Sequence, residues 1–124
     1  MDNVAVVGSA YEAFGKGDIA GVLDVLDDAV VWSVPKTLPQ GGQFTGKDGV
    51  TAFFQGLGAA WDPLALEMVA MGAISEDRIA AIVRGSGALR GGGPSGYGAV
   101  HVFTLSAGKV IRFDEYTDVD APLA

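Results

Sequence analysis

The sequence changes character at Pro63, and this division limits the folds that the chain can adopt. Apolar residues before Pro63 recur at helical intervals, whereas four strand-like segments separated by short polar or glycine-rich turns follow it. These segments are Leu64–Ser75, Ile79–Leu89, Tyr97–Leu105 and Val110–Asp118. Helices followed by consecutive strands indicate an α+β fold, in which one antiparallel sheet curls against the helices.

The first half of the chain predicts two helices and a strand. Residues 3–15 have helical spacing, and Gly15 and Gly17 end that helix. Asp18 then caps a second helix that runs through Leu26. The β-rich segment 29–34 predicts a strand that ends at a proline. The apolar positions of the first helix are Val4, Val7, Ala10, Tyr11 and Phe14.

A loop over Lys36–Gly46 separates this strand from a third helix. Residues 45–48 fit a capping box, which marks the start of that helix. The glycine-rich segment Arg90–Gly96 predicts a flexible hairpin loop between two strands of the second half. The third helix carries its apolar face on Val50, Phe53, Phe54 and Leu57.

Size and composition exclude several classes of protein. A chain of 124 residues predicts a single domain over residues 1–124 with one hydrophobic core. Lys and Arg number 8 against 15 Asp and Glu, so the net charge of −7 argues against nucleic-acid and membrane partners. The chain has no cysteine and one histidine, and we expect no disulfide, metal site or cofactor. Without a signal peptide or a membrane-spanning apolar run, the expected location is the cytoplasm.

Two glycine patterns resemble nucleotide-binding motifs but lack the required context. Residues 91–96 match the dinucleotide fingerprint, yet a strand follows them where that motif needs a helix. Residues 41–47 match most of a P-loop, but Asp48 stands where Ser or Thr would hold magnesium. Neither pattern supports nucleotide binding.

His101 is the only histidine and lies inside the apolar strand segment 97–105. The turn at Ser106–Gly108 predicts a three-residue hairpin loop, and that register puts His101 opposite Phe113. A two-residue turn would instead place His101 beside Asp114. Hydrophobic patterning favours the first register, because it gathers the large apolar side chains on one face. That face carries Ala99, His101, Phe103, Leu105, Ile111, Phe113, Glu115 and Thr117.

His101 and Glu115 are therefore expected to lie diagonally on one apolar face. A carboxylate buried there needs a partner, and Arg84 in the preceding strand is a candidate. An imidazole, a carboxylate and a guanidinium in an apolar cup would form an acid–base site. The alternative is structural: a hydrogen-bonded core histidine beside an ordinary ion pair.

The whole chain resembles the nuclear transport factor 2-like superfamily, in particular its SnoaL-like and ketosteroid-isomerase-related branch. The residues that carry the resemblance are Tyr11–Asp18, Leu26–Trp32, Phe44–Val50 with Phe53 and Phe54, Val100–Phe103 and Gly108–Asp118. The resemblance implies a cone-shaped curved antiparallel sheet wrapped over N-terminal helices, with a deep apolar pocket inside. It also implies a homodimer formed through the outer face of the sheet.

The resemblance places several residues at pocket-lining positions. The general-base Asp position of ketosteroid isomerases falls on Ser33, and their oxyanion-hole Asp position falls on His101. Limonene-epoxide hydrolases are similar in the same way. Their strand Arg aligns with Arg84 and one of their catalytic Asp residues aligns with Glu115, while Ser86 stands at the position of their other catalytic Asp. Both residue sets are thus substituted here. The candidate substrate-binding residues are Trp32, Ser33, Phe54, Ser86, Phe103 and Phe113.

The sequence therefore predicts an enzyme for a small apolar substrate, such as a polyketide, terpenoid or steroid-like compound. His101 would act as general acid or base, Glu115 would orient it, and Arg84 would fix Glu115 or stabilise an enolate-like oxygen. The reaction would be a cofactor-independent isomerisation, cyclisation, hydration or dehydration. The alternatives are a non-catalytic protein that binds a small ligand, and a dimeric scaffold that fills its own cavity.

Overall fold

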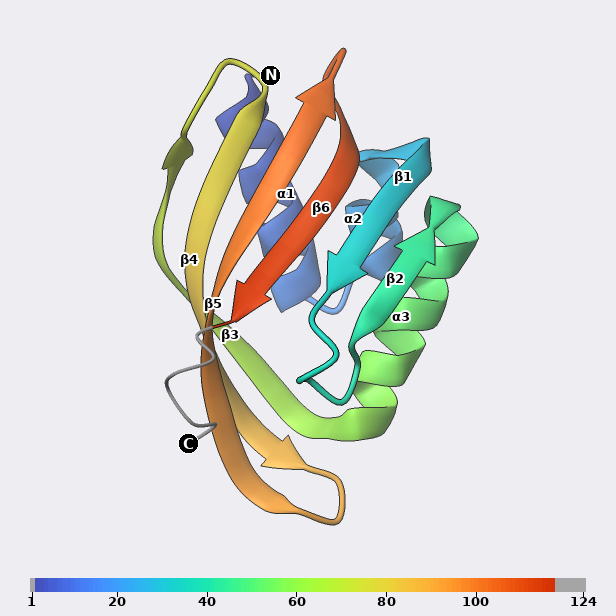
Figure 1. Cartoon of the computed structure of the whole chain (residues 1–124), viewed down its shortest axis with the longest axis vertical. Helices are drawn as coiled ribbons and strands as arrows, with labels where there is room; N and C mark the ends of the chain where they lie inside the picture. Colours follow the sequence, from blue (N-terminus) through green and yellow to red (C-terminus); the bar gives the residue numbers. More distant parts are fainter. Residues whose placement is uncertain (1, 118–124) are drawn as a thin grey trace.

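The fold is a curved six-stranded sheet with three helices on one face (Figure 1), as a computed structural model of the chain shows for residues 2–117. The strand order is β2-β1-β6-β5-β4-β3, and β1 pairs with β6 in parallel while the other pairs are antiparallel. The predicted α+β class is confirmed. The elements are α1 (Asn3–Gly15), α2 (Ile19–Asp24), β1 (Leu26–Val34), β2 (Gly42–Thr45), α3 (Gly46–Ala60), β3 (Trp61–Ala73), β4 (Arg78–Leu89), β5 (Gly93–Ser106) and β6 (Lys109–Thr117).

Helix α1 has the predicted bounds and begins at an aspartate cap. The Asp2 carboxylate accepts a hydrogen bond of 2.8 Å from the Ala5 N–H, which satisfies one of the free amides of the first turn. Val6 and Val7 are buried against the sheet, whereas Val4, expected on the inner face, is 36% exposed.

Helix α2 is shorter than predicted. It ends at Asp24, and Leu26 is the buried first residue of β1 rather than the last helical residue. Helix α3 starts where expected, but the Thr45 side chain makes no capping hydrogen bond. Thr45 is also the last residue of β2, where it pairs with Val31, so its backbone is extended.

Two predicted loops contain strand residues. The expected loop over residues 36–46 includes β2, whose residues pair with the end of β1. The expected loop over residues 90–96 is a short turn, because β5 begins at Gly93 opposite Leu89. The last predicted strand ends at Asp118, which lies outside the described residues.

The β5–β6 hairpin differs from the predicted register at its turn. Ser106 pairs with Lys109, so the turn has two residues, Ala107 and Gly108, and both have positive φ angles of 51° and 78°. A β-bulge then shifts the register, so that Thr104 faces Arg112 while Leu105 faces Val110. His101 consequently lies opposite Glu115, neither opposite Phe113 nor beside Asp114.

The bulge also explains which residues of β6 face inward. Ile111 is the extra residue, and it is 38% exposed, contrary to prediction, while Val110 is buried in its place. Beyond the bulge the predicted alternation holds, because Phe113 and Glu115 are buried and Arg112 is exposed.

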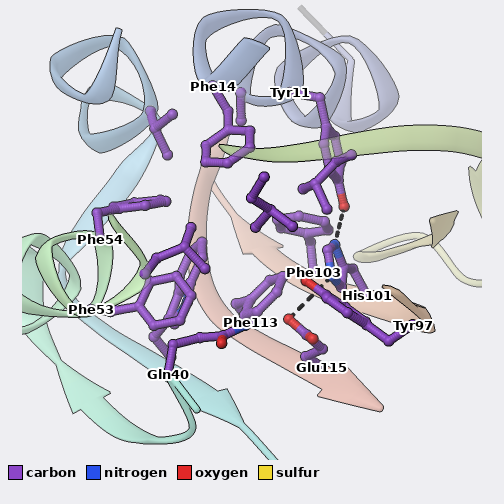
Figure 2. A pocket seen from close by; sticks show the side chains of 16 residues that line it. Tyr11, Phe14, Gln40, Phe53, Phe54, Tyr97, His101, Phe103, Phe113 and Glu115 are labelled. Atoms are coloured by element: carbon purple, nitrogen blue, oxygen red, sulfur yellow. Dashed lines mark hydrogen bonds and ion pairs between the residues drawn. The ribbon is translucent and has the colours of Figure 1, made fainter. Parts of the chain in front are cut away.

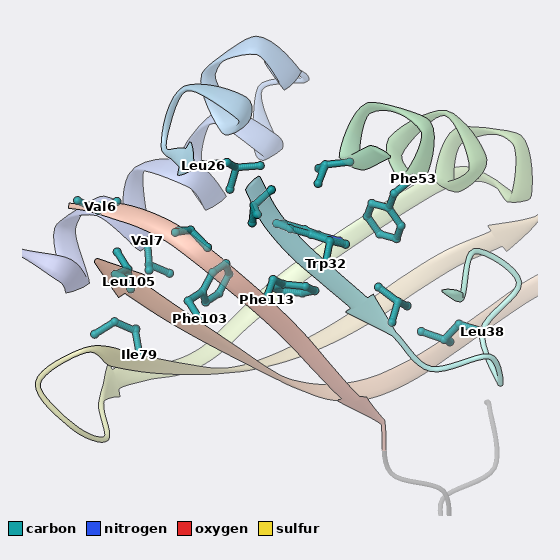
Figure 3. Close-up of a cluster of buried hydrophobic side chains, with 14 residues drawn as sticks. Val6, Val7, Leu26, Trp32, Leu38, Phe53, Ile79, Phe103, Leu105 and Phe113 are labelled. Atoms are coloured by element: carbon teal, nitrogen blue, oxygen red, sulfur yellow. The ribbon is translucent and has the colours of Figure 1, made fainter. Parts of the chain in front are cut away.

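The main core lies between the concave face of the sheet and the helices (Figure 3). At its centre the rings of Trp32 and Phe113 stack at 4.0 Å, and Phe103 meets Phe113 edge-on at 5.0 Å. Aromatic side chains are large, and pairs in these geometries add to the stabilisation from burial. The core therefore fixes β5 and β6, the two strands that carry His101 and Glu115. No helix among residues 2–117 is long and apolar enough to cross a membrane.

Candidate functional site

A pocket opens between the helices and the concave face of the sheet (Figure 2). About 540 Å³ of atom-free space lies within it, a figure that includes the open solvent at its mouth. Most of its wall is apolar, and helices α1, α2 and α3 all contribute to it. The lining residues are Ala10, Tyr11, Phe14, Val22, Trp32, Gln40, Phe53, Phe54, Leu57, Leu64, Leu66, Tyr97, His101, Phe103, Phe113 and Glu115.

Three polar side chains form a continuous chain across one wall of this pocket. The Tyr11 hydroxyl, on α1, is hydrogen-bonded to Nδ1 of His101 on β5 at 2.5 Å. On the other side of the imidazole, Nε2 lies 3.2 Å from Oε1 of Glu115 on β6. The side chains of His101 and Glu115 are only 7% and 5% exposed. A helix and two strands thus bring together residues that are far apart in the sequence (Figure 2).

Burial keeps the tyrosine of this chain in its protonated form. Desolvation raises the pKa of Tyr11 well above its usual value of 10.0, and the negative charge of Glu115 raises it further. The hydroxyl therefore retains its proton while it is hydrogen-bonded to Nδ1.

The described residues leave several buried polar atoms of the pocket without a hydrogen-bond partner. Oε2 of Glu115 and Nε1 of Trp32 have none, and Nε2 of His101 makes no well-aligned hydrogen bond although it lies 3.2 Å from Oε1 of Glu115. Buried polar groups are normally satisfied, and exceptions need an explanation. In the wall of a pocket, such atoms are suited to bind a ligand.

A second tyrosine lies at the pocket, braced by a tryptophan and a glutamine. Tyr97 packs on Trp61 with their ring centroids 5.8 Å apart. The indole Nε1 of Trp61 donates a 3.1 Å hydrogen bond to Oε1 of Gln40, whose side chain is buried. Burial and the charge of Glu115 raise the pKa of Tyr97, and a side-chain contact with Gln40 lowers it in part. Tyr97 also remains protonated.

The structure brings six of the predicted site residues to the pocket. His101 and Glu115 are in direct contact there, closer than the diagonal relationship expected from the sequence. The predicted aromatic residues that line the pocket are Trp32, Phe54, Phe103 and Phe113.

Three predicted site residues lie elsewhere. Arg84 is exposed on the outer face of the sheet, opposite Glu67 of β3, so it does not meet Glu115. Its neighbours Val83 and Gly85 are buried, and alternation along β4 therefore turns Arg84 outward. Ser86 is exposed for the same reason. Ser33 is not among the pocket residues, because it alternates with the inward-facing Trp32 and Val34.

Sequence reasoning missed three polar residues of the pocket. The sequence predicts Tyr11 only as an apolar position of the first helix, although its hydroxyl is hydrogen-bonded to His101. Tyr97 shares the odd-numbered face of β5 with His101, which was the available signal for it. Gln40 lies in a loop, where no periodicity shows the direction of a side chain. Among residues 2–117 no cluster of three or more His, Asp and Glu side chains is arranged to hold a metal ion.

Solved structures with the same fold cover almost the entire chain. An NTF2-like protein of unknown function from Burkholderia pseudomallei superposes with a TM-score of 0.86 at 26% identity, over 95% of this chain and 92% of the other. One from Burkholderia thailandensis gives a TM-score of 0.89 at 25% identity and the same coverage. A Mycobacterium tuberculosis protein in complex with estradiol-17beta-hemisuccinate gives 0.78 at 25% identity, over 97% of both chains.

Comparison with protein families agrees with the fold. No curated protein matches the sequence significantly. The family model of the SnoaL-like domain matches residues 7–113. This range includes Tyr11, His101 and most of the pocket wall, whereas Glu115 follows it. The chain therefore belongs to the SnoaL-like domain family of the NTF2-like superfamily.

Proposed function

We propose that this protein binds a small, largely apolar substrate and transfers a proton on it, with Glu115 as the proton-transferring group. The observation that supports this most strongly is the Glu115 carboxylate itself. One of its oxygens faces His101, and the other is buried at the pocket wall without a partner among the described residues. A carboxylate with one free oxygen in an apolar, water-poor site is well suited to act as general base.

His101 and Tyr11 have supporting roles in this proposal. Both ring nitrogens of His101 are already in contact with protein groups, Nδ1 with Tyr11 and Nε2 with Glu115. The imidazole therefore orients the carboxylate and stabilises its charge, which reverses the roles expected from the sequence. Tyr11 fixes the orientation of the ring through its hydrogen bond to Nδ1. Arg84 has no part, because it lies on the other face of the sheet.

The substrate class follows from the wall of the pocket. Aromatic and aliphatic side chains from the three helices and the sheet surround the carboxylate, and they favour a fused-ring or polycyclic apolar compound. The steroid ester bound by the mycobacterial neighbour supports a ligand of this kind. The proposed substrates are polyketides, terpenoids or steroid-like compounds, and the proposed reactions are isomerisation, cyclisation, hydration or dehydration.

Proton exchange on a simple ketone tests this function without the natural substrate. 2-Tetralone is an apolar bicyclic ketone with acidic α-hydrogens, and we expect the protein to accelerate their exchange in D₂O. Glu115→Gln should lower the catalysed exchange rate by about 100-fold or more, as expected for loss of a general base. NMR of the ketone measures the rate.

The adjacent carboxylate provides a matched control. Asp114 pairs with Arg112 away from the pocket, so Asp114→Asn should leave the exchange rate unchanged. If the wild-type protein gives no exchange above the buffer rate, or if Glu115→Gln exchanges as fast as wild type, the proposal is wrong.

A binding protein without chemistry is the second candidate function. The structure of the mycobacterial neighbour with a steroid ester supports ligand binding in this fold. Saturable binding of 2-tetralone with no acceleration of its exchange would select this candidate over the enzyme.

We further propose that two copies pair through the outer face of the sheet. Ile82, Val100 and Tyr116 are exposed there by 48%, 37% and 58%, and they adjoin one another on β4, β5 and β6. Contiguous exposed apolar side chains of this kind are typical of protein interfaces. Light scattering should give the mass of a dimer, and Ile82→Lys should shift it to that of a monomer. A wild-type monomer would refute the pairing.

A further inference from the structure

The pocket contains a tyrosine that the proton transfer proposed above does not use. Tyr97 lies on β5, four residues before His101 and on the same face of the strand. Figure 2 shows its side chain reaching toward His101 and Glu115. The hydroxyl is close enough to Glu115 for that carboxylate to affect its ionisation.

A glycine on the neighbouring strand makes this orientation of Tyr97 possible. Gly85 is the cross-strand partner of Tyr97 on β4. A β-carbon on residue 85 would lie 2.5 Å from Cε1 of the Tyr97 ring and 3.0 Å from its hydroxyl oxygen. The phenol therefore lies across the backbone of Gly85, and any side chain at this position would displace it.

Trp61 also packs on the ring of Tyr97, and Gln40 is hydrogen-bonded to Trp61. Trp61 is 3% exposed, and its indole is fixed by the hydrogen bond to Gln40. Since the amide oxygen of Gln40 accepts from Trp61, the NH₂ group is the part of that side chain left for the pocket. Three residues from separate elements thus fix a phenol whose hydroxyl is a hydrogen-bond donor.

We propose that the Tyr97 hydroxyl is a specificity-determining donor, which selects ligands that carry a carbonyl oxygen beside the carbon presented to Glu115. This inference rests on the proposed binding of a small apolar ligand, and it identifies a carbonyl group as the polar part of that ligand. Tyr11 does not take this role, because its hydroxyl is already hydrogen-bonded to His101. A site built to donate a hydrogen bond discriminates against an analogue that lacks the acceptor.

The same contact assists proton transfer in a ketone. The α-carbon loses its proton to a Glu115 oxygen, and the electron pair of the broken C–H bond moves into the carbonyl group. The negative charge then develops on the oxygen that accepts from Tyr97, and a preorganised donor stabilises that charge. The proton on Glu115 is then replaced by deuterium from the solvent, and transfer of that deuteron to the α-carbon completes the exchange.

A pair of ligands that differ only in one oxygen tests the proposal. Wild-type protein should bind 2-tetralone about 10-fold more tightly than tetralin, which has the same carbon frame without the carbonyl. Tyr97→Phe should weaken the binding of 2-tetralone but not that of tetralin, so that the ratio of the two affinities falls to about 1. Isothermal titration calorimetry measures both affinities. Tyr116→Phe, at an exposed tyrosine on the outer face, should keep the wild-type ratio.

An infrared measurement separates a direct hydrogen bond from a structural role of the ring. The carbonyl stretch of ¹³C-labelled 2-tetralone should move to lower frequency in the wild-type complex, and Tyr97→Phe should abolish that shift. Gly85→Ala, which displaces the ring but keeps the hydroxyl, should also abolish it. A wild-type ratio near 1, no binding of 2-tetralone by the wild-type protein, or an unchanged infrared shift in Tyr97→Phe would overturn the proposal.

These outcomes are independent of the test of Glu115. A ketone preference that depends on Tyr97, with no acceleration of exchange, supports Tyr97 as the selecting donor and refutes the enzyme. Exchange that depends on Glu115, with no effect of Tyr97→Phe on the ketone preference, supports the enzyme and refutes the role of Tyr97.

Discussion

His101 and Glu115 face each other directly across β5 and β6, with Nε2 of the imidazole 3.2 Å from Oε1 of the carboxylate. Both side chains are more than nine-tenths buried. A buried charge that loses its partner destabilises a protein far more than replacement of the entire pair. The two residues should therefore be coupled energetically as well as in space.

A double-mutant cycle measures this coupling. We expect His101→Gln and Glu115→Gln together to destabilise the protein less than the sum of the two single variants, with a coupling free energy of about 1–3 kcal/mol. Urea denaturation of the four proteins gives the value. Additive effects would show that the contact contributes nothing to folding.

Tyr11→Phe should affect both stability and proton exchange. It removes the hydrogen-bond partner of Nδ1 of His101 in a buried site, and we expect a loss of about 1–3 kcal/mol from the free energy of unfolding. The 2-tetralone exchange rate should fall by roughly 10-fold, because the ring that orients Glu115 loses its anchor. A variant with wild-type exchange would remove Tyr11 from the site.

The two buried tyrosines predict a loss of stability in alkali. Folding raises the pKa of Tyr11 and of Tyr97 above the ordinary value of 10.0, so the folded state holds protons that the unfolded state releases. The two groups therefore contribute their full amount to the free energy of unfolding below about pH 10. This contribution is lost as the pH rises from 10 toward the raised pKa values of the folded state, by about 1.4 kcal/mol per pH unit for each group.

The alkaline effect can be assigned by substitution. The free energy of unfolding should decline less steeply between pH 10 and 11 in the double variant Tyr11→Phe and Tyr97→Phe than in the wild-type protein. Absorbance at 295 nm follows phenolate formation in parallel. Ionisation of either residue in the native state near pH 10 would contradict the prediction.

Two apolar residues of β6 test the register of the hairpin. Phe113 is 2% exposed and stacks on Trp32, and Phe113→Ala should lower the free energy of unfolding by about 3–5 kcal/mol. Ile111 is 38% exposed at the bulge, and Ile111→Ala should cost less than about 1 kcal/mol. Equal losses would mean that Ile111 points inward, as the sequence pattern alone indicates.

Two helix caps form another matched pair. Asp2 accepts a hydrogen bond from the Ala5 N–H at the start of α1, and Asp2→Ala should destabilise the protein by about 1 kcal/mol. Thr45 precedes α3 without such a bond, so Thr45→Ala should have a smaller effect. Thermal denaturation compares them, and a larger loss for Thr45→Ala would contradict the assignment of the caps.

Strong periodicity predicted the fold better than it predicted the ends of elements. Helix α1 and the four consecutive strands follow from long apolar patterns, whereas β2 has four residues and shows none. Leu26 continued the helical pattern of α2, yet burial in the sheet is a tertiary effect that spacing does not show.

The site was predictable from the sequence only where the periodicity is strong. His101 and Glu115 fell on the correct face because the alternation of β5 and β6 is clear. Arg84 could not be placed, since both faces of β4 are apolar in sequence and only pairing with β3 and β5 shows that Ile82 and Arg84 face outward. Gln40 reaches the pocket from a loop, and its position depends on a hydrogen bond with Trp61.

The bulge at Ile111 limits how the β5–β6 hairpin can change its length. Surface turns usually tolerate inserted or deleted residues. Here a two-residue turn without the bulge would bring Asp114 inward to face His101 and would turn Glu115 to the solvent. One supernumerary residue therefore decides which of two adjacent carboxylates belongs to the interior. Relatives with a different turn length should carry their buried carboxylate at a compensating position.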